Sequence, residues 1–186
     1  AASVIGMNKY KNNVQLWEEK TNRKAQDDLS DNQAVIFGSK AEEPLRQIYA
    51  LKRRTDVVKV KGTLINKEHS FIRVNLDGWI TEDNGLWEGK TATVHSFDEL
   101  KKWFNELPPQ YYVQCLHALA VTGCDYIDLT ALIYLSFSTS SEVAQIREFR
   151  IKREDVLEDI KYLIQEELRF WYQVENDEEP LLKMKY

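Results

Sequence analysis

Two carboxylates and one lysine in the middle of the chain have the types and spacing needed for phosphodiester hydrolysis. Asp77 lies in a segment of alternating polar and apolar residues, and Glu88 and Lys90 lie two apart in the next such segment. Residues two apart on a strand share a face, and the Asp-Asn-Gly run at 83–85 is typical of a tight hairpin turn. The sequence therefore predicts that a hairpin brings the three side chains together. Carboxylates can hold Mg²⁺, and an ammonium can position water or offset negative charge in the transition state.

The same three residues have a less specific interpretation. An Asp followed by Glu-x-Lys is a common pattern, and across a hairpin it can form an ordinary surface salt bridge. By themselves, the residue types leave both interpretations open.

The elements that would position these residues can be read from the hydrophobic pattern. Apolar spacing and capping residues predict helices at 13–20, about 31–51, 96–107, 110–122 and 153–171. Pro44 predicts either a break in the second of these helices or a restart of the helix near Ala41, with Pro44 in its first turn. Strands are predicted at 57–65, 71–80, 86–94, 126–137 and 143–151, the last one after a Ser/Thr turn. This order indicates an α/β (α+β) fold, with a mixed central sheet flanked by helices.

Length and composition restrict the class of protein. The 186 residues (21.8 kDa) fit a single domain, 1–186, with a charged tail at 176–186 that we expect to fray. The net charge of −5 gives no general affinity for nucleic acid, although a local basic groove remains compatible with it. Cys115 and Cys124 have neither disulfide-scaffold nor zinc spacing, so we expect reduced thiols. No targeting or membrane segment is visible, which predicts a cytoplasmic protein.

Several stretches of the chain resemble the YqaJ-like viral recombinase family, the relatives of bacteriophage lambda exonuclease among the PD-(D/E)XK nucleases. The stretches are NLDGW at 75–79 and WEGKTA at 87–92, IGMNKYKNNVQLWEEKT at 5–21, FGSKAEEPLRQIY at 37–49, YYVQCLHALAVTG at 111–123 and RFWYQV at 169–174. Each motif is weak alone, but their order and spacing together are specific, and they span nearly the whole chain.

The resemblance implies a restriction-endonuclease-like fold with a divalent-metal site. Its metal-binding positions would be Glu42, Asp77, Glu88 and the Gly89 carbonyl, and the metal would be Mg²⁺, with Mn²⁺ as a substitute. The catalytic residues would be Asp77, Glu88, Lys90, which helps to activate water, and Gln114 at the edge of the site. The neighbouring Glu43 is the alternative to Glu42, although the Gly-x-x-x-Glu spacing favours Glu42.

The chain departs from the family pattern in two places. Gly89 stands between Glu88 and Lys90, where the family more often has an apolar residue. The Ser-Asp pair that usually precedes the opening motif is missing before Ala1, so we expect a truncated N-terminal motif, and residues for 5′-phosphate recognition are not transferred from the family.

The implied function is a Mg²⁺-dependent exonuclease, expected to act 5′-to-3′ on linear duplex DNA ends in phage-type homologous recombination in a bacterial host. Its expected partner is a single-strand annealing recombinase. Two alternatives remain open, namely a non-catalytic interaction protein with a nuclease fold, and a related nuclease that acts on single strands or flaps. Because lambda exonuclease closes three subunits around DNA, we expect a homotrimer whose channel is lined by Lys52, Arg53, Arg54, Lys59 and Lys61.

Overall fold

The computed structural model describes residues 1–139 and 143–183. The helices are α1 (Asn13–Lys20), α2 (Gln33–Arg53), α3 (Phe97–Asn105), α4 (Pro109–Thr122) and α5 (Leu157–Glu175), with a 3₁₀ turn at Arg153–Val156. The strands are β1 (Val57–Val58), β2 (Leu64–Ile65), β3 (Arg73–Val74), β4 (Gly78–Ile80), β5 (Gly85–Val94), β6 (Tyr126–Leu135) and β7 (Ala144–Lys152). Within the described residues, no helix is both long and apolar enough to cross a membrane.

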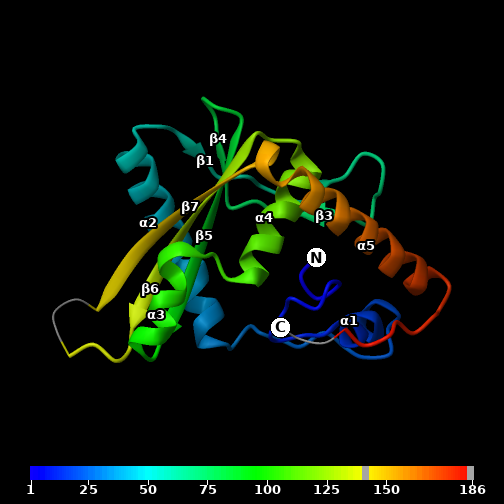
Figure 1. Ribbon diagram of the computed structural model, residues 1–186. Coiled ribbons are helices and arrows are strands. Elements are labelled where there is room, and N and C mark those ends of the chain that lie inside the picture. Colours follow the sequence, from blue (N-terminus) through cyan, green and yellow to red (C-terminus); the bar gives the residue numbers. More distant parts are fainter. Residues whose placement is uncertain (140–142, 184–186) are drawn as a thin grey trace.

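A five-stranded mixed sheet forms the centre of the molecule (Figure 1), in the order β1-β4-β5-β6-β7. Strands β5 and β6 pair in parallel over ten residues, and the other neighbouring strands pair antiparallel. Strands β2 and β3 form a separate two-stranded sheet. The predicted mixed sheet flanked by helices is therefore confirmed.

The two faces of the sheet are covered by different helices (Figure 1). On one face, Leu86 of β5 and the inward residues of β6 pack against α3, α4 and α5 in the largest hydrophobic cluster. On the other face, Trp87 of β5 packs against Leu45 and Tyr49 of α2. Because neighbouring residues of β5 point to opposite faces, Glu88 and Lys90 lie on the α4 side, whereas Trp87 and Gly89 lie on the α2 side.

The strands before the hairpin are shorter than predicted. The predicted strand 57–65 divides into β1 and β2, and the predicted strand 71–80 divides into β3 and β4, because the chain changes partners from the small sheet to the main one. Gly62, with a φ of 87°, lies in the first interruption. Asp77 lies in the second, directly before β4, so the interruption is itself part of the candidate site.

Two further expectations were wrong. Helix α2 runs through Pro44 without a break, since Pro44 is exposed and the Lys40 carbonyl that loses its amide partner can be hydrated. The described part of the tail, expected to fray, is instead hydrogen-bonded to α1 in the structure. The side chain of Asn13 donates to the Leu181 carbonyl at 2.8 Å and accepts from the Lys183 amide at 2.9 Å. Residues 140–142, in the expected Ser/Thr turn, and 184–186 of the tail lie outside the described residues.

Candidate active site

The β4–β5 hairpin places Asp77 beside the Glu-Gly-Lys segment of β5. Asn84 occupies the left-handed region at the turn, with a φ of 48°. The Gly89 amide donates a hydrogen bond to Asp77 Oδ2 at 3.0 Å. The side chains of Asp77 and Glu88 lie close enough for each to shift the pKa of the other. The proximity expected from the sequence is thus present in the structure.

Glu88 is the centre of the cluster. It is only 2% exposed, and its Oε1 atom accepts hydrogen bonds from both Lys90 Nζ and Gln114 Nε2. Lys90 lies on the same strand, whereas Gln114 reaches the carboxylate from α4 on the facing layer. The Lys90 side chain is 18% exposed, so Lys90 is the member of this pair that reaches solvent.

Burial and charge shift the pKa values of all three ionisable groups. Burial raises the pKa of Glu88 to about 7, because it disfavours the charged form more than Lys90 favours it, and the charge of Asp77 adds to the rise. The pKa of Asp77 is raised as well, again mainly by burial. Burial alone would lower the pKa of Lys90, but the charges of Glu88 and Asp77 outweigh it and raise that pKa. The lysine therefore stays charged between two acids that resist ionisation.

The structure distinguishes Glu42 from Glu43 on α2. Glu42 Oε1 forms an ion pair with Lys59 Nζ at 3.0 Å, and its charge contributes to the raised pKa of Asp77. Glu43 instead forms an ion pair with Arg46 on the same helix, at 2.6 Å. The geometry therefore favours Glu42 as the α2 residue that belongs to the site, although its carboxylate is directed at Lys59.

The donor atoms of the cluster suit a hard divalent cation. Asp77, Glu88 and the Gly89 carbonyl offer oxygen donors, which Mg²⁺ and Mn²⁺ prefer. The two acids contact each other in a buried place, where a cation would relieve their repulsion. Over residues 1–139 and 143–183, no three His, Cys, Asp or Glu side chains are grouped closely enough to hold a metal by themselves. A third carboxylate ligand would require Glu42 to leave Lys59.

Of the five basic residues expected to line a channel, only Lys59 lies at the edge of this cluster, through Glu42. Lys52 and Arg53 both pair with Glu148 of β7, at 2.9 and 2.8 Å. Lys59 pairs with Glu42, as described above, and Arg54 and Lys61 are exposed. Their role on DNA remains a prediction.

Tyr111 and Trp87 are two neighbours of the cluster that were not among the predicted site residues. The ring of Tyr111 lies 5.9 Å from Lys90 Nζ. Its position three residues before Gln114 places both residues on one face of α4, so helical spacing was the available signal. Trp87 packs behind the Glu-Gly-Lys segment, on the α2 face of β5.

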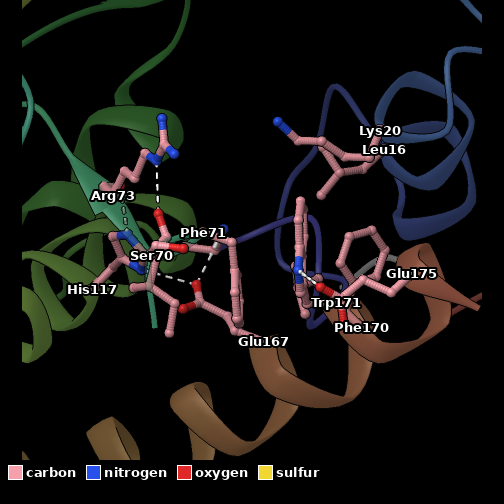
Figure 2. Close-up of a pocket in the computed structure, with 13 residues that line it drawn as sticks. Leu16, Lys20, Ser70, Phe71, Arg73, His117, Glu167, Phe170, Trp171 and Glu175 are labelled. Carbon is pink, nitrogen blue, oxygen red and sulfur yellow. Dashed lines mark hydrogen bonds and ion pairs between the residues drawn. The ribbon is translucent and has the colours of Figure 1, made fainter. Parts of the chain in front are cut away.

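His117, one turn after Gln114, lies outside the cluster around Glu88, between α4, β3 and α5. Its Nε2 lies 2.9 Å from the Arg73 carbonyl, and its Nδ1 lies 2.9 Å from Glu167 Oε1. It lines a cavity of about 670 Å³ between α1, α5 and the segment that leads into β3 (Figure 2), where the rings of Phe71 and Trp171 are stacked at 4.7 Å. His117 therefore ties α4 to β3 and α5 and does not approach Glu88.

Comparison with known proteins identifies the family to which the chain belongs. The sequence model of the YqaJ-like viral recombinase domain matches residues 1–125, two thirds of the chain. This chain belongs to that family. The membership expected from the motifs is thus confirmed. The chain is also 29% identical over 172 residues to the uncharacterized protein YqaJ of Bacillus subtilis, a match that covers 92% of this chain and 50% of YqaJ. It therefore spans half the length of that curated relative.

Solved structures of exonucleases share the fold of this YqaJ-family chain. One is an alkaline exonuclease from Laribacter hongkongensis, which has also been solved in complex with dAMP. It matches with a TM-score of 0.67 at 19% identity, and the match covers 95% of this chain and 87% of the exonuclease chain. A phage-related exonuclease from Haemophilus somnus matches with a TM-score of 0.60 at 14% identity. This match covers 87% of this chain and 80% of the exonuclease chain.

Proposed function

We propose that this protein is a Mg²⁺-dependent deoxyribonuclease that degrades linear duplex DNA from its ends. The observation that carries the proposal is the convergence of Asp77, Lys90 and Gln114 on the buried carboxylate of Glu88. A purely structural role would not need two mutually repelling acids and a lysine in one buried place, because such a cluster lowers stability unless a ligand compensates it.

Each residue of the cluster has a distinct proposed role. Asp77, Glu88 and the Gly89 carbonyl would hold the cation, with Glu42 as a further ligand once it is released from Lys59. The bound cation would supply Lewis-acid stabilisation of the negative charge that develops on the scissile phosphate. Lys90 orients the attacking water and offsets charge at the phosphate, while Gln114 fixes the Glu88 carboxylate and orients a water through its amide.

The substrate and the biological role are proposed from the family and the fold. The family is a viral recombinase domain family, and the similar structures are exonucleases, one of them solved with dAMP. Degradation of duplex ends, expected to run 5′-to-3′, would expose single strands. A single-strand annealing recombinase would then be the protein that uses them. We therefore propose a role in phage-type homologous recombination.

The test is a panel of DNA substrates incubated with the protein and either Mg²⁺ or EDTA. Linear duplex DNA with and without a 5′-phosphate would be compared with circular duplex, single strands and flaps. We expect nucleotides to be released from linear duplex DNA alone, and only with Mg²⁺. Preference for single strands or flaps would assign the related-nuclease alternative, and no cleavage of any substrate would favour the non-catalytic alternative.

A further inference from the structure

The reverse side of the catalytic strand is occupied by one large aromatic residue. Trp87 is fully buried on the α2 face of β5, opposite the face that carries Glu88 and Lys90. Its indole Nε1 donates to Thr130 Oγ1 at 3.0 Å, and Thr130 on β6 is the register partner of Gly89. The hydrogen bond therefore holds the ring along the strand, toward Gly89.

The ring closely approaches the two glycines that flank the acids. A Cβ atom on Gly89, between Glu88 and Lys90, would lie 2.8 Å from Trp87 Cη2. A Cβ atom on Gly78, directly after Asp77, would lie 3.3 Å from Trp87 Cε3 and 2.6 Å from Val57 Cγ1. Gly78 is also the register partner of Trp87 across β4 and β5. The indole therefore excludes a side chain at position 89, whereas at position 78 Val57 is the closer obstacle and the indole adds a second, tighter-than-usual contact.

We infer that Trp87 is a positioning residue for the proposed nuclease site, acting on its acids mainly through the backbone of Gly89. The indole fills the space where a side chain at position 89 would pack, and thereby fixes the Gly89 amide that donates to Asp77. One side chain thus sets the separation between Asp77, directly before β4, and the Glu-Gly-Lys segment. This inference rests on the proposed function, because positioning has a catalytic meaning only if the site cleaves DNA.

The first test compares the same substitution at two buried tryptophans. Trp87→Phe removes the indole N–H and the outer ring atoms. It should lower kcat on saturating linear duplex DNA by about 10-fold and leave the Kd for DNA unchanged, because small displacements of reacting groups cost rate. Trp17→Phe is the control, since Trp17 is 4% exposed in a cluster with Val4 and Phe170 and should leave kcat at the wild-type value. Rates are compared at a temperature at which circular dichroism shows every variant folded.

The second test is a rescue. Gly89→Ala introduces the Cβ that meets the indole, and should lower kcat by about 100-fold. Adding Trp87→Phe makes room for this methyl group, so the double variant should be about 10-fold faster than Gly89→Ala alone, a non-additive result expected for coupled residues and not for independent ones. Additive losses, or a wild-type kcat in Trp87→Phe, would overturn the inference.

A readout independent of activity separates this inference from the nuclease assignment. Hydrogen exchange of the Gly89 amide, followed by NMR without metal, reports on its bond to Asp77. Trp87→Phe should accelerate this exchange, whereas Trp17→Phe should not. A wild-type protein that cleaves no DNA would refute the proposed function, while unchanged exchange at Gly89 in Trp87→Phe would refute the positioning role.

Discussion

At the scale of single residues, opposing effects act on the ionisation of Glu88, the residue at the centre of the site. Its carboxylate is buried, contacts another acid, and is held by Lys90 and Gln114. Burial and the neighbouring Asp77 favour the protonated form, whereas Lys90 favours the charged one. The raised pKa shows that the first two effects prevail in the metal-free protein.

The first prediction concerns stability against pH. The ordinary pKa of a glutamate is 4.5, and in the fold that of Glu88 is about 7. Between these values the folded protein holds a proton that the unfolded chain releases, so the free energy of unfolding should fall as pH rises through this window. Glu88→Gln should flatten this part of the profile. Thermal melts in EDTA across the window measure it, and a profile unchanged by Glu88→Gln would contradict the shifted pKa.

The second prediction concerns Gln114. Gln114→Ala removes an amide that donates to Glu88 from α4, and should lower kcat by roughly 10- to 1000-fold, the range of one lost catalytic hydrogen bond. Gln110→Ala, one turn earlier on the same helix, serves as the matched control. Steady-state rates on linear duplex DNA decide the matter, and equal rates for both variants would leave Gln114 a merely structural residue.

At the scale of elements, the β4–β5 hairpin determines the site because it brings Asp77 to β5. A third prediction tests its packing. A Cβ atom on Gly85 would lie 2.3 Å from Tyr126 Cζ, so Gly85→Ala should lower the free energy of unfolding by about 1–3 kcal/mol. Asn84→Gly is the control, since glycine accepts the positive φ of the turn without strain. Urea denaturation measures both, and equal stability of Gly85→Ala and wild type would show that Tyr126 can move away.

The same hairpin shows which parts of the structure could be predicted from the sequence. Asn84-Gly85 and the period-two spacing of Glu88 and Lys90 are local signals, and they predicted where Asp77 would lie. The division of 71–80 into β3 and β4 could not be predicted, because it depends on which distant strands each half pairs with. The pairing of Glu42 with Lys59 and the contact of Trp87 with both glycines depend equally on tertiary packing.

At the scale of the whole molecule, the net charge of −5 must be reconciled with a DNA substrate. A monomer with this charge has little long-range attraction for duplex DNA. Three of the five basic channel candidates are already paired with Glu42 or Glu148. A closed ring would concentrate the remaining positive charge around one DNA axis.

The fourth prediction is therefore a cyclic homotrimer. Light scattering at micromolar concentration should give about three times the chain mass of 21.8 kDa, and long linear DNA should be degraded processively, because a ring cannot easily dissociate from its substrate. A strict monomer that releases its substrate after each cut would contradict the ring and leave the cluster around Glu88 unaffected.

The most direct test of the nuclease assignment, and the fifth prediction, compares wild type with Asp77→Asn on linear duplex DNA. Asparagine keeps an oxygen that can accept from the Gly89 amide but removes the charge that holds a cation. We expect Mg²⁺-dependent nucleotide release by the wild type, none with EDTA, and a loss of at least about 1000-fold in Asp77→Asn. The variant should melt in EDTA no lower than the wild type, because the repulsion of Glu88 is relieved. Cleavage by folded Asp77→Asn at the wild-type rate, or by the wild type in EDTA, would contradict the assignment.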